Sequence, residues 1–211
     1  MIKRKGHRIV LLLLALLLLA PCIQAQNDDT SFGGWHFVEL DHKFGESKWS
    51  GMLYFEHENY QYQRLDCWFL RTSVKYKALP WLKLALGYDY LKIPMSYGNR
   101  MVCDAVGSLS EGHLSTSLRF RYLHTWYPEL GTEGNELRTR LIVAYSFDKV
   151  PLTPYVAVEI FTWVNEWRRS RNYIGCTYDF NKHVQLEGFY MLVFSHRAPE
   201  HIIGLGMNFN L

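Results

Sequence analysis

The sequence predicts an all-β protein, an antiparallel transmembrane β-barrel of 10–12 strands with a polar lumen filled by side chains. Three observations predict this fold class. The N-terminus has the pattern of an export signal. The rest of the chain is a succession of segments in which apolar and polar residues alternate, and many of these segments are long enough to cross a membrane.

The export signal comprises residues 1–25. Four basic residues within positions 3–8 precede a leucine-rich run at 9–20, and Ile23-Gln24-Ala25 provides a small residue at the cleavage point. The run of 12 residues is shorter than the roughly 20 that a membrane-spanning helix needs. Lipidation at Cys22 is disfavoured because Pro21 stands where a small residue is usual. We therefore expect residues 26–211 to form one outer-membrane barrel domain.

Charge and cysteine content exclude several classes of protein. The whole chain has a net charge of +3, but the signal carries four of the 23 basic residues and none of the 20 acidic ones. The remaining 19 basic and 20 acidic residues give −1, which does not indicate a nucleic-acid partner. Cys67, Cys103 and Cys176 are scattered and odd in number, so no zinc site is expected, and any disulfide among them is left open.

Ten alternating segments are expected to be strands. Several reach the roughly 9–11 residues that a tilted strand needs to span a membrane, whereas strands of soluble domains average about five or six. The segments are 35–42, 48–59, 64–77, 81–93, 112–125, 136–147, 154–163, 168–180, 183–194 and 201–211.

Turn lengths leave the parity of the strand count open. Short connections at 78–80 and 181–182 look like periplasmic turns. With ten strands and both ends of the chain in the periplasm, the turn at 78–80 would lie on the outer side of the membrane and the long segment 94–111 on the periplasmic side. This is the reverse of the usual arrangement, in which the long loops lie outside. A further strand near Asn99–Val106 restores the later order but gives about eleven strands, an odd number.

The two faces of these strands differ in chemistry. In the last strand Ile203, Leu205 and Met207 alternate with Gly204 and Gly206, and elsewhere the apolar face opposes a charged one. This pattern favours lipid outside, although a lipocalin-like soluble barrel has the same period. We expect paired charges to plug the lumen rather than line a pore; a pore, if present, would favour anions. The expected lumen charges are Glu56, Glu58, Arg71, Lys75, Lys83, Asp89, Arg119, Arg121, Arg138, Arg140, Glu159, Arg171 and Glu187.

Aromatic residues gather at strand ends, where membrane-interface girdles would place them. The expected interface tryptophans are Trp35, Trp49, Trp81, Trp126, Trp163 and Trp167. Ordinary packing of strand aromatics is the alternative interpretation. The aromatic and basic segment 163–171 also suits contact with lipid phosphates.

His113 and Ser115 are the catalytic candidates. Alternation places both side chains on one strand face, as a base and a nucleophile require. The pair looks similar to the His-x-Ser pair of outer-membrane phospholipases and lipid A deacylases, whose residues face lipid, whereas this pair should face the lumen. Glu136 and Glu159 are the available acids. The remaining histidines lack metal-binding spacing, so no metal and no cofactor are expected.

The chain resembles the uncharacterised DUF2490 family of outer-membrane barrels over nearly its whole mature length. The residues that carry the resemblance are Trp35, Lys48-Trp49, Tyr76-Lys77-Ala78-Leu79-Pro80-Trp81-Leu82, Gly87-Tyr88-Asp89-Tyr90, Leu137-Arg138-Thr139-Arg140, Pro154-Tyr155, Glu159-Ile160-Phe161 and Arg171-Asn172-Tyr173-Ile174-Gly175. The resemblance implies an exported barrel and supplies no activity.

These observations lead to a non-enzymatic outer-membrane barrel of a Gram-negative bacterium with a structural, adhesive or small-solute role. The first alternative is an outer-membrane acyl hydrolase that uses His113 and Ser115, and the second is a soluble periplasmic ligand-binding barrel. Expected partners are outer-membrane lipid, lipopolysaccharide and the barrel assembly machinery. The sequence leaves the oligomeric state open.

Overall fold

A computed structural model of the chain describes residues 31–60, 64–163, 166–196 and 198–211, so the predicted signal lies outside the described residues. In the part described, no helix is long and apolar enough to cross a membrane. The described strands are β1 (Ser31–Lys43), β2 (Trp49–Tyr60), β3 (Arg64–Leu79), β4 (Leu82–Ile93), β5 (Ser96–Glu111), β6 (Leu114–Tyr127), β7 (Thr132–Tyr145), β8 (Leu152–Trp163), β9 (Glu166–Asp179), β10 (Val184–Ser195) and β11 (Glu200–Asn210).

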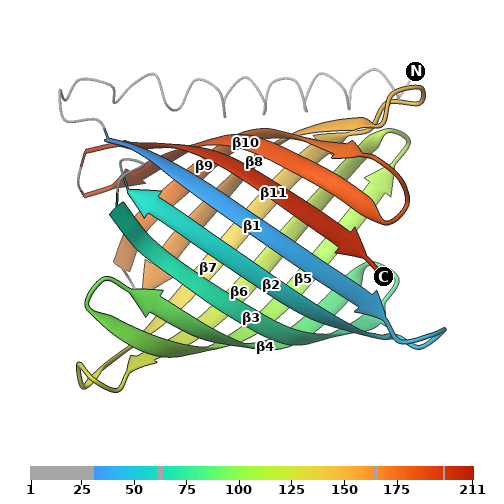
Figure 1. The fold of residues 1–211 in the computed structure, drawn as a ribbon. Coiled ribbons are helices and arrows are strands. Elements are labelled where there is room, and N and C mark those ends of the chain that lie inside the picture. Colours follow the sequence, from blue (N-terminus) through green and yellow to red (C-terminus); the bar gives the residue numbers. More distant parts are fainter. Residues whose placement is uncertain (1–30, 61–63, 164–165, 197) are drawn as a thin grey trace.

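The strands form one closed barrel (Figure 1). Each strand pairs antiparallel with its neighbour in sequence, and β1 closes the barrel by pairing in parallel with β11. The predicted antiparallel barrel of 10–12 strands is therefore confirmed. Parallel closure follows from the odd number, because strands that alternate in direction leave the first and the eleventh pointing the same way.

The further strand expected near Asn99–Val106 is present as β5. It occupies the segment that a count of ten strands leaves as a long connection. It pairs with β4 from Leu82↔Gly107 to Ile93↔Ser96 and with β6 over a similar length. Its alternation is weak because Val102 faces inward with Arg100 and Asp104, whereas Asn99 and Gly107 face outward. Hydrogen bonding along both edges supplies the order that the local pattern does not show.

The odd number of strands places the two ends of the described chain at opposite rims. Ser31 begins β1 at one rim, here the N-terminal rim, and Leu211 follows β11 at the other, here the C-terminal rim (Figure 1). The short turns expected near 78–80 and 181–182 both lie at the C-terminal rim. Gly45 and Gly112, at the C-terminal rim, and Gly131, at the other, have φ values of 57–60°, a left-handed conformation that favours glycine in tight turns.

The outward face of the barrel is apolar and carries two aromatic belts. Exposed aliphatic side chains such as Val74, Leu86, Ile174 and Ile203 lie between them. Ring contacts form the N-terminal belt at Phe32–His201, Trp68–Tyr90, Tyr88–Trp126, His124–Trp126 and Trp167–His196. The C-terminal belt contains His42–Phe44, Trp49–Tyr76, His113–Tyr145 and Tyr178–Phe180.

The separation of the belts matches a bilayer. On β3, Trp68 belongs to one belt and Tyr76 to the other, and at about 3.3 Å per residue they lie about 26 Å apart along the strand. A strand tilt of about 40° reduces this to about 20 Å across the membrane, close to the apolar band of roughly 25 Å in transmembrane barrels.

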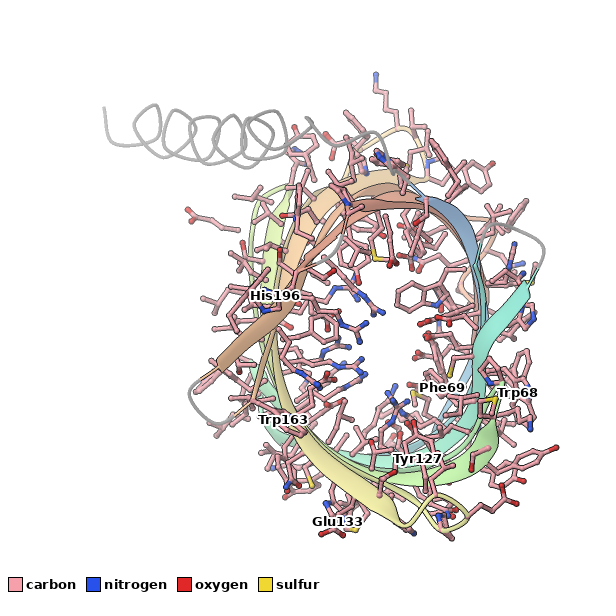
Figure 2. The ribbon with its side chains drawn as sticks, turned by 90° about the vertical axis from the view of Figure 1, so that its left-hand side faces the viewer. Trp68, Phe69, Tyr127, Glu133, Trp163 and His196 are labelled. Carbon is pink, nitrogen blue, oxygen red and sulfur yellow. The ribbon has the colours of Figure 1, made fainter. Side chains whose placement is uncertain are left out.

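Two of the predicted interface tryptophans do not lie on the outer face. Trp35 points into the barrel, where its side chain is 8% exposed and meets Phe189 at 6.0 Å between ring centroids; the interface prediction is wrong for this residue. Trp35 is two residues before Phe37 and four before Glu39, so all three side chains point to the same inner face of β1. Its place near the end of the strand did not indicate which face it occupies. Trp163, labelled in Figure 2, is the last residue of β8, at the N-terminal rim, and occupies an inward-facing position of that strand. Its side chain is 40% exposed and lies beneath the guanidinium of Arg168.

Inside, an aromatic cluster packs against one side of the wall. Its buried residues are Trp35, Tyr155, Ala157, Tyr173, Phe189, Met191 and Val193. The rings fit because β11 presents glycines inward. A Cβ on Gly204 would lie 2.0 Å from the Phe189 ring, and one on Gly206 would lie 2.0 Å from the Phe37 ring. The alternating glycines of the last strand therefore make room for large side chains in the lumen.

Candidate functional site

Two pairs of directly opposed arginines on β6 and β7 form the centre of the lumen wall. The register places Arg119 opposite Arg140 and Arg121 opposite Arg138, and all four side chains point inward. Like charges directly across an antiparallel pair are destabilising. Two such pairs in succession therefore need negative partners from elsewhere.

Three of these arginines have a carboxylate partner. Arg119 donates from Nη2 to Glu159 at 2.7 Å, and Arg138 donates from Nε to Glu136 at 2.6 Å. Arg121 makes two bonds of 2.7 Å to the two oxygens of Asp104. Such two-pronged bonds fix the position of both side chains.

Arg140 differs from its neighbours. Within the described part of the chain it forms no ion pair with a carboxylate, and its guanidinium carbon lies 4.5 Å from the ring centroid of Tyr173. Glu159 is its partner in the register with β8, but that carboxylate accepts bonds from Arg119 and from the Tyr173 hydroxyl. Arg140 therefore interacts with Glu159 and Glu187 at longer range, without an ion pair to either carboxylate.

Arg171 on β9 reaches towards the opposite wall. Its Nη2 lies 3.6 Å from Glu58 on β2, and its Nη1 lies 4.0 Å from Glu159 on β8. The guanidinium also covers the ring of Trp35 at 4.4 Å. Because β9 and β2 are four strands apart around the barrel, this side chain bridges part of the lumen.

A second group of charges lies on β3, β4 and β5. Asp89 is fully buried and accepts two bonds from Arg71, at 2.6 and 2.8 Å, and one from Arg100 at 2.5 Å. Lys75 pairs with Glu39 and Asp41 of β1. Two further inward acids accept hydrogen bonds from phenol groups, Glu56 from Tyr54 and Glu187 from Tyr155.

Most of the predicted lumen charges therefore lie together inside the barrel. Lys83 lies apart: it has inward parity, but its side chain is exposed near the start of β4 and has no ion pair among the described residues. The prediction missed Glu39, Asp41, Arg100, Asp104, Glu136 and Arg169. Arg100 and Asp104 were missed because the two faces of the further strand near Asn99–Val106 were not assigned, whereas the alternation of Glu39 and Asp41 with Val38 and Leu40 was available in the sequence.

Side chains leave a cavity of about 190 Å³ in this lumen. Seen from the N-terminal rim, guanidinium nitrogens gather on one side of the interior and carboxylate oxygens face them from the other (Figure 2). The same view shows neighbouring Trp68 and Phe69 on opposite sides of the wall. The charged lining consists of Arg71, Arg119, Arg121, Arg138, Arg140 and Arg171 against Glu39, Glu56, Glu159 and Glu187, a formal charge of +2.

Several donors in this wall lack an acceptor. In the described residues, the buried Nε atoms of Arg119, Arg140 and Arg171 have no hydrogen-bond partner, nor does Nη2 of Arg100. A buried donor without a partner costs about 1–3 kcal/mol. The protein alone therefore leaves the arginine cluster incompletely satisfied.

The catalytic candidates do not form a working pair. His113 lies in the turn before β6, 44% exposed, with its ring against Tyr145 and its Nδ1 3.6 Å from Asp148. Ser115 faces Ala144 and Ser110 in the register, and within the described chain no hydrogen bond joins it to His113. Neither Glu136 nor Glu159 contacts His113, since both pair with arginines.

Metal ligation has no candidate in the described residues, where no three His, Cys, Asp or Glu side chains gather closely enough. Cys67, Cys103 and Cys176 are free thiols.

Comparison with known proteins agrees with this architecture. No curated protein matches the sequence. Among solved structures, the barrel is similar to the NanC porin, with a TM-score of 0.52 and 12% sequence identity, over 76% of this chain and 85% of that chain. At this identity the likeness concerns the fold alone. A family of proteins described as "Protein of unknown function (DUF2490)" matches over residues 32–202, and the chain with its porin-like barrel belongs to that family.

Proposed function

We propose that this protein is an outer-membrane pore for small solutes that favours anions. The observation that carries the proposal is the cavity among the lumen side chains, whose charged lining has six arginines against four acids. Asp89, Asp104 and Glu136, the partners of Arg71, Arg121 and Arg138, are not part of that lining. Charge rings of one sign select permeating ions of the other sign. Arg140 contributes most directly, because no carboxylate partners it in the described chain.

The outward face supports a membrane location over a soluble barrel. Its exposed aliphatic residues would be costly in water, and the two belts lie about 20 Å apart, near the thickness that transmembrane barrels bury. In this setting the belts contact outer-membrane lipid, lipopolysaccharide among it. Arg168 over Trp163 and Lys92 over Tyr97 place cations at the N-terminal rim, where headgroup phosphates would lie.

The size of the lumen makes the pore a narrow one. Barrels of about eight strands are filled by side chains, and open porins have about sixteen, so eleven strands fall between. At about 30 Å³ per water molecule the cavity holds roughly six waters. Small hydrated ions and small organic anions match this space, whereas folded proteins and oligosaccharides do not.

Conductance across a planar bilayer tests the proposal. With purified protein and a tenfold KCl gradient, we expect discrete current steps and a reversal potential displaced towards the chloride equilibrium potential. A reversal potential on the potassium side would overturn the anion preference. Absence of current from folded, heat-modifiable protein would overturn the pore and favour a structural or adhesive role.

A separate prediction concerns orientation. Because five strands, β2 to β6, lie between the β1–β2 turn and the β6–β7 turn, these two turns must face opposite sides of the membrane. In a chain whose native cysteines are replaced by serine, we expect Glu46→Cys in the β1–β2 turn and Leu130→Cys in the β6–β7 turn to differ in labelling. One should react with a bulky polyethylene-glycol maleimide on intact cells, and the other only after the outer membrane is permeabilised. Labelling of both on intact cells would contradict an odd number of crossings.

A further inference from the structure

A row of four inward residues crosses β6 to β9 in continuous register. Arg119 faces Arg140, Arg140 faces Glu159, and Glu159 faces Arg171. Adjacent strands lie about 4.8 Å apart, so the row spans only about 15 Å of the wall. The row therefore holds three guanidinium groups and one carboxylate, and a second carboxylate, Glu58 of β2, lies 3.6 Å from Arg171.

We propose that Arg119, Arg140 and Arg171 form a discrete binding subsite for a small oxyanion, a carboxylate or a phosphate, in the lumen. The inference rests on the proposed function, in which this subsite is the place where a permeating anion pauses. All three residues line the cavity, so a solute inside the barrel meets them directly.

The one carboxylate in the row is already engaged. Glu159, 2% exposed, accepts the 2.7 Å bond from Arg119 and a 3.1 Å bond from the Tyr173 hydroxyl, and it lies 4.0 Å from Arg171. Arg140 faces Glu159 in the register and is attracted by it, but among the described residues it makes no ion pair with this carboxylate. The row has a formal charge of +2, and a bound anion would reduce it.

The donors indicate the kind of anion. Buried Nε atoms of all three arginines lack an acceptor, and Arg171 as a whole is only 5% exposed. A guanidinium group presents its N–H donors as a planar fork that matches two oxygens of one carboxylate or phosphate. A spherical chloride ion receives both N–H groups at one atom, with more bent hydrogen bonds than two separate oxygens allow, so the subsite should prefer oxyanions to halides.

Aromatic rings hold the guanidinium groups in place before any ligand arrives. Arg140 lies over Tyr173 at 4.5 Å, and Arg171 lies between Trp35 at 4.4 Å and Phe161 at 4.8 Å. Stacking of this kind restricts the side chains without using their N–H groups. Less conformational entropy is then lost when an anion binds.

Calorimetric titration of the purified barrel in detergent with inorganic phosphate, acetate and chloride, at constant ionic strength, tests the subsite. We expect saturable binding of phosphate or acetate and weaker binding of chloride; the two oxyanion arms show which class is preferred. Arg140→Gln should weaken oxyanion affinity about tenfold, the loss expected for a charge-assisted hydrogen bond. Lys83→Gln, which removes the same charge away from the cavity, should change it less than twofold.

Arg140→Lys separates fork recognition from charge alone. This variant keeps the positive charge and loses the planar fork of N–H donors, so we expect the barrel to lose its preference for oxyanions over chloride. Arg140→Lys also serves as the test if Arg140→Gln does not fold. The proposal is overturned if wild-type protein shows no saturable oxyanion binding, or if Arg140→Gln and Lys83→Gln behave alike. Saturable binding without current would refute the pore and leave the subsite standing, whereas anion-selective current without binding would do the reverse.

Discussion

Asp89→Asn is expected to destabilise the barrel by about 3–5 kcal/mol, the usual cost of removing one partner from a buried ion pair. Asp89 is fully buried, and its two oxygens accept three bonds from Arg71 and Arg100. An uncharged amide cannot balance two guanidinium groups, which are themselves only 4% and 12% exposed. The variant would leave both charges buried without a counter-ion.

Urea unfolding followed by tryptophan fluorescence, or loss of heat-modifiable gel mobility, measures this effect. Asp148→Asn is the matched control, because Asp148 is 77% exposed and its contact with His113 is 3.6 Å long. We expect that control to change the free energy of unfolding by less than about 0.5 kcal/mol, as for most surface ion pairs. Equal unfolding midpoints for the two variants would show that water in the lumen already screens Asp89.

Combined replacement Arg138→Glu and Arg140→Glu is expected to convert the pore from anion to cation preference. The formal charge of the cavity lining would change from +2 to −2. In a water-filled lumen a unit charge about 8 Å from the permeating ion contributes about 0.5 kcal/mol, so a change of four charges amounts to about 2 kcal/mol. This corresponds to a roughly thirtyfold loss of anion permeability and an equal gain of cation permeability, so the anion-to-cation permeability ratio changes by roughly a thousandfold.

On the β6 side each new glutamate lies directly opposite an arginine, Arg121 or Arg119, and so replaces a repulsive cross-strand pair with an attractive one. On the other side the replacement at position 140 faces Glu159 of β8, and the replacement at position 138 removes the partner of Glu136, so heat-modifiable gel mobility must first show that the double variant folds. Reversal potentials in a KCl gradient provide the measurement, at low salt where screening is weakest. Lys83→Glu serves as a charge reversal outside the cavity lining and should leave the sign unchanged. An unaltered reversal potential in the double variant would show that ions do not pass Arg138 and Arg140.

Local alternation of apolar and polar residues determines much of this architecture. A strand places successive side chains on opposite faces, so a period of two assigned ten of the eleven strands and predicted that Arg119, Arg121, Arg138 and Arg140 share the polar side. The same rule failed for β5, where Val102 points inward and Asn99 outward, because its order depends on hydrogen bonds to β4 and β6. It also shows that Trp35 belongs inside with Glu39, although its position near a strand end suggested the interface.

By itself, then, the sequence determined ten of the strands, their two faces and the charged character of one face, because each is a property of neighbouring residues along one strand. Only the tertiary structure decided which strands are partners and in what register. The alternation within a strand does not choose between registers that differ by two residues, because both put the same side chains on the same face of the sheet. Register opposes Arg119 to Arg140 and leaves Arg140 without a carboxylate among the described residues. Closure of eleven strands places β1 beside β11 in parallel and encloses the cavity in which those arginines meet.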